Sequence, residues 1–242
     1  MKTTRKITIA FAWVALAGLS AISARADSYG DFEYTDNGTS ATITGYTGSG
    51  GDVTIPETIN ALPTASIASW AFHASSNLTS VTIPDSITSI GYSAFRECSD
   101  LTGIVIPTNI NSLGEWVFYK CSSLESITIP DTITSIGQGL FSDCTGLTNA
   151  VIGNAVTSIG DYAFRRCPLS SITIPDDVTS IGNSAFSDCS SLQSMTIPNQ
   201  VSSIGKWAFT DCSGLTNVAM GSSVASIGSY AFANCTGLTD II

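Results

Sequence analysis

Histidine is almost absent from this chain, and its cysteines lack the spacing that metal sites require. His73 is the single histidine among 242 residues, and no two cysteines are separated by two residues. Zinc sites and Cys–His catalytic pairs need such groups close together. The acidic residues are scattered and form no Asp-x-Asp-x-Asp-Gly calcium loop. The sequence therefore predicts a protein that is not an enzyme and has no catalytic, metal-binding or cofactor-binding residues.

Basic residues are also scarce. The chain has nine lysines and arginines against 19 aspartates and glutamates. Four of the nine lie in the first 26 residues, which leaves five basic residues and a net charge of −14 (5 − 19) for positions 27–242. Because such a surface repels phosphate backbones, we expect no nucleic-acid partner.

The one long apolar run lies at the N-terminus and has the features of a secretory signal peptide. Lys2–Lys6 carries three positive charges, residues 7–22 are mainly apolar, and Ala24-Arg25-Ala26 is a small-x-small cleavage site. We expect residues 1–26 to be removed by cleavage after Ala26, with a retained membrane anchor as the alternative. No later segment is apolar enough to span a bilayer. The expected location is therefore extracellular or on the cell surface, without a transmembrane segment after cleavage.

From Asp52 onward the chain consists of eight copies of one pattern about 23 residues long, L-x-x-V-x-I-P-x-x-V-T-S-I-G-x-x-A-F-x-x-C-S-x. The phenylalanines of the eight copies are Phe72, Phe95, Phe118, Phe141, Phe164, Phe186, Phe209 and Phe232. One interval is shorter because Cys167-Pro168-Leu169 lacks a loop residue, in a turn where deletions are tolerated. A short fixed period indicates a solenoid, so we expect one array over residues 52–242 with a truncated last repeat.

Each repeat is expected to form one coil of strands and turns. In the repeat Leu101–Ser123, alternating apolar residues around Ile104 predict an inward-facing strand, which Pro107 ends. Gly114 is interpreted as the residue that lets the chain change direction sharply, and Phe118 as a core residue of the far side. Stacking of successive strands predicts a parallel β-ladder with a step of about 4.8 Å.

Residues 27–51 do not follow the repeat and are predicted to cap the first coil. Phe32–Tyr34 and Ala41–Thr44 alternate around Asp36-Asn37-Gly38, which is a strong hairpin signal. At the other end, Ile241-Ile242 falls within an expected strand. We expect either a truncated product or an open edge that another chain covers, and self-association would be one way to cover it.

Three motifs carry a resemblance to a known family: Val81–Pro84 (VTIP), Thr88–Gly91 (TSIG) and Ala94–Cys98 (AFREC). They are similar to the bacterial surface-antigen (BspA-like) class of leucine-rich repeats, and the similarity extends over residues 53–242. The resemblance implies a β-rich leucine-rich-repeat solenoid, displayed or secreted by a bacterium, that binds proteins or host and matrix surfaces. It implies no catalytic residues, because the class has none in common.

One cysteine stands near the end of each repeat from the second onward: Cys98, Cys121, Cys144, Cys167, Cys189, Cys212 and Cys235. Exported proteins often form disulfides, and adjacent coils lie within the Cα range that a disulfide allows. The number is odd, however, and neighbours in register rarely present the required dihedral angle. We therefore expect a buried column of small apolar thiols, with disulfides as the alternative.

Two exposed rows are candidate contact surfaces. The outward strand positions form a flat row of small residues, where we expect contacts at Ser80, Thr82, Ser126, Thr128, Ser171, Thr173, Ser194 and Thr196. Two positions before each phenylalanine stands a residue that is aromatic in five repeats of eight. The alternative contact strip comprises Trp116, Tyr162 and Trp207. A different interpretation is that these rings lie flat over the corner and cover a neighbouring glycine.

These observations predict a secreted or cell-surface, non-enzymatic binding or adhesion module. Its solenoid surface would face protein partners of a host, a matrix or a neighbouring cell. A carbohydrate-binding module that uses the aromatic strip is one alternative, and a structural, self-assembling spacer is another. Ice binding is a further alternative, because regular rows of hydroxyl groups could order water.

Overall fold

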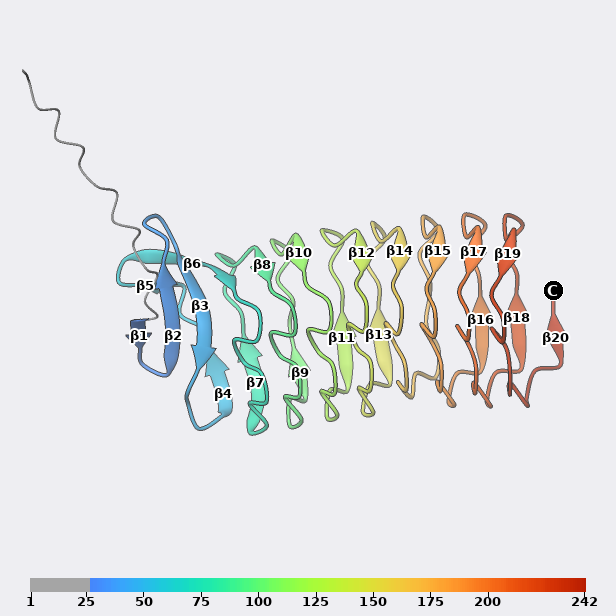
Figure 1. The fold of residues 1–242 in the computed structure, drawn as a ribbon, viewed down its shortest axis with the longest axis horizontal. Helices are drawn as coiled ribbons and strands as arrows, with labels where there is room; N and C mark the ends of the chain where they lie inside the picture. The colour runs from blue at the N-terminus through green and yellow to red at the C-terminus, as the bar shows by residue number, and fades with distance from the viewer. Residues whose placement is uncertain (1–26) are drawn as a thin grey trace, which may run out of the picture.

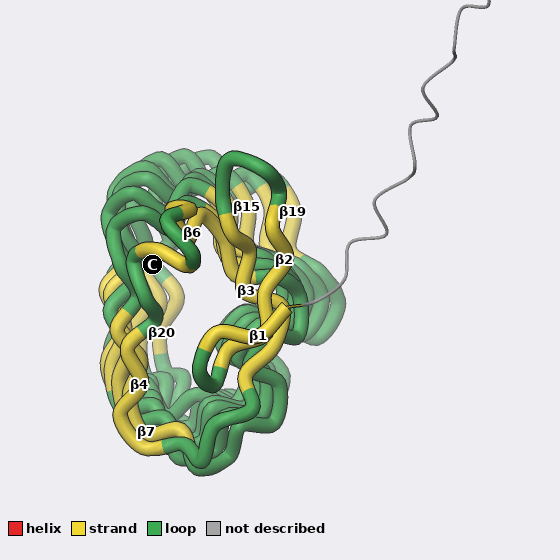
Figure 2. The backbone as a smooth tube through the Cα atoms, turned by 90° about the vertical axis from the view of Figure 1, so that its left-hand side faces the viewer, coloured by secondary structure: helices red, strands yellow, loops and turns green. Residues whose placement is uncertain are grey.

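The computed structural model describes residues 27–242, and the predicted signal peptide at 1–26 lies outside the described residues. In the described part, every regular element is a short strand and there is no helix. The coils lie side by side along one axis (Figure 1). Viewed along that axis, β4 (Gly51–Thr54) and β7 (Leu78–Thr82) lie on one side of the coil and β15 (Ser180–Ile181) on the opposite side (Figure 2). The β-rich solenoid predicted from the repeat is confirmed.

The leading strands of the coils build a first, parallel ladder. Its members are β4, β7, β9 (Gly103–Ile104), β11 (Ser126–Thr128), β13 (Asn149–Val151), β16 (Ser194–Thr196), β18 (Asn217–Ala219) and β20 (Asp240–Ile241). Pairing divides them into three groups, β4-β7-β9, β11-β13 and β16-β18-β20. The coil at residues 169–175 adds no strand, although one was expected around Ser171 and Thr173.

The coil without a strand follows the shortened turn. In three of the other turns the residue before the leading leucine bonds to the previous coil, as the N–H of Ser123 does to the carbonyl of Ser99 at 3.0 Å. The shortened turn has Pro168 at this place, and proline has no N–H. The coil therefore begins without this bond, as do the coils that start at Leu147 and Leu192, which nevertheless form β13 and β16. The stack tolerates the deletion, and the first ladder is interrupted at this coil.

The Thr-Ser-Ile segments of the repeats build a second ladder on the opposite side. Its strands are β6 (Leu62–Ile67), β8 (Ser89–Ile90), β10 (Ser112–Leu113), β12 (Ser135–Ile136), β14 (Ser158–Ile159), β15, β17 (Ser203–Ile204) and β19 (Ser226–Ile227). They pair in parallel with serine beside serine. The extra residues of the first repeat form β5 (Thr58–Ile59), which is antiparallel to β6. This ladder is interrupted once, between β10 and β12.

The core is a set of columns, of which the phenylalanine column is the most regular. The seven phenylalanines from Phe72 to Phe209 are fully buried, and Phe232 in the last coil is partly buried. Neighbouring rings stack with their centroids 4.8–5.8 Å apart. Burying one such side chain contributes about 1.5–3 kcal/mol. Because each ring is covered by the rings of the coils on either side, a coil obtains this stabilisation only within the stack.

The N-terminal cap is a meander of β1 (Asp27–Tyr29), β2 (Phe32–Asp36) and β3 (Ala41–Tyr46). The predicted hairpin corresponds to β2 and β3, which are antiparallel. β3 also pairs in parallel with β6 of the first coil, so the cap is bonded to the second ladder. The ring of Tyr46 stacks on Phe72 at 5.3 Å, and the cap thereby continues the phenylalanine column.

The interpretation of Gly114 as the residue that turns the chain is wrong. Its φ is not positive, and its N–H donates to the carbonyl of Ile90 in the previous coil at 2.8 Å. A β-carbon at this position would lie 2.6 Å from backbone atoms of Gly91 and Tyr92. Glycine is needed here because two coils approach closely, and not because the backbone is left-handed.

Two columns of mostly non-glycine residues make the sharp corners instead. One stands two positions before the phenylalanine and includes Trp116 (φ 57°); the other stands two positions after it and includes Lys120 (φ 58°). A left-handed backbone costs an ordinary residue roughly 1–2 kcal/mol, so surrounding bonds must hold it. The N–H of Trp116 donates to the carbonyl of Gln138 in the next coil at 2.9 Å. The N–H of Lys120 donates to Ser142 at the same distance.

Candidate binding surfaces

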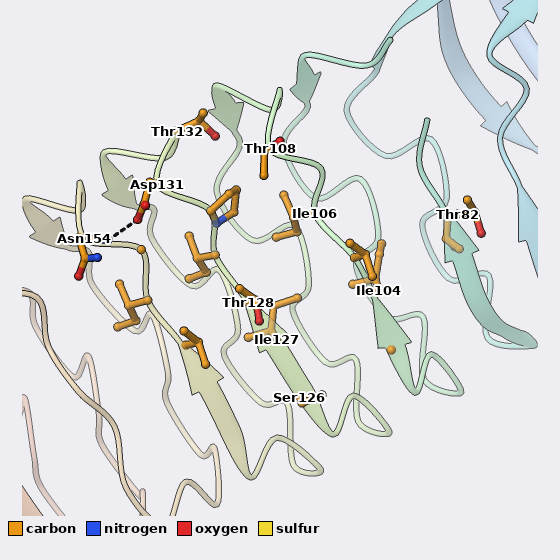
Figure 3. A pocket seen from close by; sticks show the side chains of 18 of the residues that line it. Thr82, Ile104, Ile106, Thr108, Ser126, Ile127, Thr128, Asp131, Thr132 and Asn154 are labelled. Carbon is orange, nitrogen blue, oxygen red and sulfur yellow. Dashed lines mark hydrogen bonds between the residues drawn. The ribbon is translucent and has the colours of Figure 1, made fainter. Parts of the chain in front are cut away.

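The first ladder carries a hollow of about 860 Å³ that extends from β7 to just beyond β13 (Figure 3). Its floor is formed by the buried residues Ile104, Ile106, Ile127, Ile129 and Ile152. Four of the predicted contact residues line it: Ser80, Thr82, Ser126 and Thr128. Val105 and Val151 also line it, and they are 78% and 50% exposed. The hollow is therefore apolar at its base and bordered by small hydroxyl groups.

The other four predicted ladder contacts lie elsewhere. Ser171 and Thr173 are exposed, but they belong to the coil without a strand and do not line the hollow. Ser194 lies in β16, and Thr196 lines a smaller hollow of about 240 Å³ together with Met220. The predicted row thus forms two groups instead of one continuous ladder, because the unpaired coil lies between them.

The large hollow lies where the stack opens. In the described chain no ladder joins β9 to β11 or β10 to β12, and Figure 1 shows the wide spacing between β10 and β12. Leu113 is only partly buried here, whereas the isoleucines of its column from Ile67 to Ile204 are buried. A β-carbon on Gly137 would meet no atom closer than 3.4 Å, compared with 2.6 Å at Gly114. The coils are therefore further apart on the side of the second ladder at this step, whereas on the side of the first ladder the N–H of Glu125 still donates to the carbonyl of Thr102 at 3.1 Å.

On the corner side, the same two coils remain packed. The N–H of Phe118 donates to the carbonyl of Leu140 at 3.0 Å. The rings of Phe118 and Phe141 stack at 5.5 Å with an angle of 1° between their planes. The opening is thus a wedge that is closed at the phenylalanine column. It leaves the facing edges of β9 and β11 unpaired beside the apolar floor.

The aromatic strip is only partly available to a ligand. Trp116 and Tyr162 are half-buried, and their rings stack at 6.2 Å. Between them the ring of Trp116 covers Gly139, where a side chain would strike it. The interpretation that these rings cover a glycine is therefore confirmed for Trp116. Trp207 is 44% exposed, and its ring is nearly parallel to that of Tyr230 at 6.3 Å.

A second aromatic cluster, around Trp70, was missed in the sequence. Arg96 lies between two rings, with its guanidinium carbon 5.6 Å from the ring centroid of Trp70 and 4.6 Å from that of Tyr119. Tyr92 meets Trp70 edge-on at 5.3 Å, and His73 packs on the same ring at 5.0 Å. The sequence did contain a signal of this cluster. The residue after the repeat phenylalanine is Arg96 in one repeat and Tyr119 in the next, so stacked coils place a cation beside an aromatic ring.

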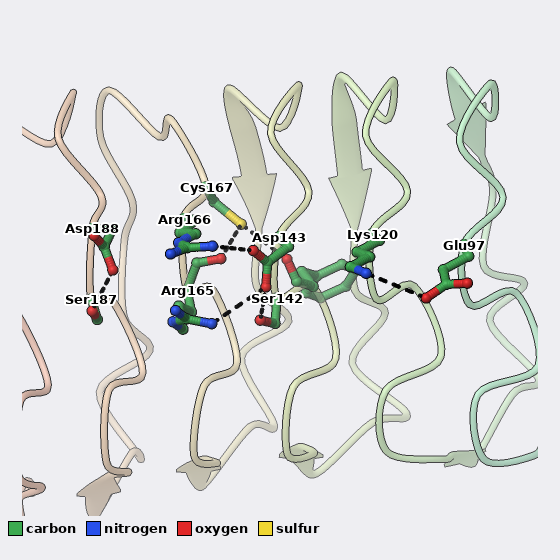
Figure 4. A network of polar contacts seen from close by, with 10 residues as sticks. Glu97, Lys120, Ser142, Asp143, Arg165, Arg166, Cys167, Ser187 and Asp188 are labelled. Carbon is green, nitrogen blue, oxygen red and sulfur yellow. Dashed lines mark hydrogen bonds and ion pairs between the residues drawn. The ribbon is translucent and has the colours of Figure 1, made fainter.

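The left-handed column after the phenylalanine carries ion pairs between coils (Figure 4). Glu97 pairs with Lys120 at 3.5 Å, and Asp143 pairs with Arg166 at 3.1 Å and with Arg165 at 3.6 Å. Exposed pairs of this kind contribute about 0–1 kcal/mol each. Among the described residues, no group of three or more histidine, cysteine or acidic side chains could hold a metal ion.

Six of the seven cysteines are buried and Cys235 is partly buried, and all seven thiols are free. Each Sγ donates to the carbonyl of the phenylalanine one coil earlier, at 3.0–3.2 Å. Burial raises the pKa of Cys98 and of Cys212 to about 12. The thiols are therefore protonated donors at neutral pH, which makes them poor nucleophiles.

The repeat also matches a family model. Residues 51–169 and 157–242 match the model described as BspA type leucine-rich repeat region, in six copies. The chain belongs to the BspA-type leucine-rich repeat family. The motifs VTIP, TSIG and AFREC therefore identified this BspA-type protein correctly.

Solved structures agree with this assignment. A leucine-rich cell surface protein from Faecalibacterium prausnitzii is 31% identical, with a TM-score of 0.60 over 90% of this chain and 76% of that chain. The leucine-rich repeat protein of T. pallidum is 28% identical, with a TM-score of 0.61 over 89% of this chain and 92% of that one. The pneumococcal vaccine antigen PcpA shares the fold at 18% identity, with a TM-score of 0.57 over 90% and 70% of the two chains. The comparison with curated proteins gave no match.

The family and its structural relatives fit a bacterial cell-surface repeat protein. Within residues 27–242, no helix is long and apolar enough to cross a membrane.

Proposed function

We propose that this BspA-type chain is a secreted or cell-surface, non-enzymatic binding module that holds a protein partner in the hollow over β7 to β13. Adhesion to a host, a matrix or a neighbouring cell would follow from that contact. The observation that supports the proposal is the coincidence of three features at one place. These are an apolar floor, exposed valines at the rim and unpaired strand edges.

The apolar character of the hollow favours a protein segment with apolar side chains. Asp131 is the single charged residue that lines it. Val105 is 78% exposed although it lies between two buried isoleucines. An exposed apolar patch with a polar border is typical of a protein interaction site.

The unpaired edges favour an extended segment. In the described chain no ladder bond joins β9 to β11, although the N–H of Glu125 donates to the carbonyl of Thr102 directly before these strands. The partner would pair with backbone groups of β9 and β11 beyond this bond. A peptide in β conformation can add its own N–H and C=O groups at such an edge, while the floor accepts its alternate side chains. The hydroxyl groups of Thr82 and Thr128 would border that segment.

The test uses the mature chain as bait for proteins of host-cell surfaces and matrices, followed by affinity measurement with the purified partner. We expect Val105→Asp to weaken binding at least about tenfold, because it places a charge over an apolar floor. Thr173→Asp is the matched control, since Thr173 is exposed and outside the hollow. Equal loss in both variants, or no loss in Val105→Asp, would contradict the proposal.

Carbohydrate binding by the aromatic strip is the second candidate. It is favoured by Trp207 and Tyr230, whose nearly parallel rings are 44% and 67% exposed. Such rings can stack on the apolar face of a sugar. A module of this kind would bind a neutral glycan, lose it in Trp207→Ala and keep it in Val105→Asp. A glycan that binds Trp207→Ala as well as the parent would remove this candidate.

We also propose that the chain has no enzymatic role. The buried thiols are protonated, and His73 packs on Trp70, so neither supports a nucleophile and its base. Hydrolase activity of the purified chain that a single substitution abolishes would overturn this part.

A further inference from the structure

All positive side-chain charge of the described chain lies on the corner side of the solenoid. The five basic residues of positions 27–242 are Arg96, Lys120, Arg165, Arg166 and Lys206. Each stands within three residues of a repeat phenylalanine, and none lies in a strand of either ladder. Because the rest of the surface is acidic, a negatively charged ligand meets attraction only at the corners.

Arg96 is held between two rings, and its Nη1 has no hydrogen-bond partner among the described residues. The rings of Trp70 and Tyr119 contact its guanidinium at 5.6 and 4.6 Å. Cation–π contacts of this kind are attractive and favour this orientation of the group. Among residues 27–242, its one hydrogen-bond partner is Glu97, at 3.4 Å. A strong charge-assisted bond is shorter, about 2.7–2.9 Å.

Ser93 and Arg96 each have a buried polar side-chain atom without a hydrogen-bond partner among residues 27–242. Ser93 is fully buried, and its Oγ makes no hydrogen bond. The Nε of Arg96 is likewise buried and unpaired. Buried polar groups are nearly always hydrogen-bonded, so an unpaired donor and hydroxyl in one cluster are unusual. Because Ser93 is fully buried, a ligand at the surface can reach only Arg96, whose side chain is 29% exposed.

The local charge is positive. Arg96 and Lys120 share one carboxylate oxygen of Glu97, at 3.4 and 3.5 Å. The Nζ of Lys120 also lies 5.2 Å from the ring of Tyr119. Two cations share one anion, and neither has a short bond to it. A second carboxylate can therefore bind without the loss of an optimal ion pair.

We propose that Arg96 and Lys120, with the rings of Trp70 and Tyr92, bind a saccharide that carries a carboxylate. The carboxylate would accept hydrogen bonds from the guanidinium edge and from the Lys120 Nζ. Trp70 and Tyr92 are 44% and 39% exposed, so the apolar face of the sugar can lie on one of these rings. An acidic peptide would use the cations but would gain nothing from the rings. This site lies on the corner side and is independent of the hollow on the first ladder.

The test is a calorimetric titration with 3′-sialyllactose and with trigalacturonate, and lactose is the neutral control. We expect both acidic sugars to bind at least about tenfold more tightly than lactose, and less tightly as salt rises. Arg96→Ala and Trp70→Ala should each weaken binding about tenfold. Arg96→Lys keeps the charge but loses the planar fork, so it should also weaken binding. It serves as the second variant where Arg96→Ala does not fold.

Arg165→Ala is the matched control. Arg165 also shares a carboxylate with a second cation, Arg166, but it makes no cation–π contact in the described chain. This variant should bind within about twofold of the parent, and so should Val105→Asp, which tests the hollow alone. The proposal is overturned by equal binding of lactose, by an unaffected Arg96→Ala, by equal loss in Arg165→Ala, or by absence of binding at about 10 mM sugar. Tighter binding of poly-glutamate than of either sugar would assign the site to acidic peptides instead.

Discussion

The Sγ of Cys144 donates a hydrogen bond of 3.0 Å to the carbonyl oxygen of Phe118, one coil earlier in the stack. The same contact recurs at every cysteine of the column. The thiol column is therefore more than apolar filling, because each thiol adds a second hydrogen bond to a phenylalanine carbonyl that already accepts a backbone N–H of its own turn.

Removal of one thiol should destabilise the stack. Cys144→Ala removes one of the two hydrogen bonds to the carbonyl of Phe118, which keeps the bond from the N–H of Cys121 at 3.1 Å, and should cost about 0.5–1.5 kcal/mol. Cys144→Ser keeps a donor at the same place and should cost less. Urea unfolding followed by circular dichroism measures both. Equal losses in the two variants would show that the volume of the thiol matters and its hydrogen bond does not.

Stability should fall at alkaline pH. The thiols have an ordinary pKa near 9.0, and burial raises that of Cys98 to about 12. Unfolded chains therefore ionise these thiols from about pH 9 upward while the folded chain keeps its protons. The contribution is fully present below pH 9 and is lost as the pH rises toward 12, at up to about 1.4 kcal/mol per pH unit and thiol. Unfolding free energies between pH 8 and 11 test this, and Cys98→Val should reduce the slope.

Two glycines of one column should differ in their response to alanine. Gly114→Ala places a β-carbon 2.6 Å from backbone atoms of Gly91 and Tyr92. Overpacking against a backbone costs about 1–3 kcal/mol or more. Gly137→Ala is the matched control, because its nearest contact would be 3.4 Å from a Glu115 side-chain atom. Melting temperatures compare the two, and a similar decrease in both would argue against the opening at Gly137.

Hydrogen exchange should detect the opening directly. The N–H of Gly160 donates to Ile136 at 2.8 Å, whereas that of Gly137 makes no hydrogen bond to the described chain. We expect the amide of Gly137 to exchange much faster than that of Gly160, since unprotected amides exchange without local unfolding. NMR exchange rates of the two amides provide the measurement. Equal protection would mean that the ladder is closed in solution. Leu113→Ile, which restores the residue of the column, tests whether the leucine holds the coils apart.

The binding surfaces were only partly predictable. Thr82 and Thr128 were expected on the first ladder and do border the hollow. Thr173 was expected beside them, but its coil, which follows the shortened turn at Pro168, forms no strand. The role of Gly114 was misassigned for a different reason. A glycine in a repeat indicates that a side chain is excluded, but the pattern does not say whether φ or a neighbouring coil excludes it.

The sequence by itself determined the period, the columns and the buried thiols, because every coil places the same residue types in the same surroundings. The phenylalanines from Phe72 to Phe232 therefore form one stacked column, and the family follows from the motifs. Only the tertiary structure decided where the stack opens and that Arg96 lies between Trp70 and Tyr119. These features depend on the distance and angle between particular coils. That geometry results from all contacts across an interface, and no single repeat contains it.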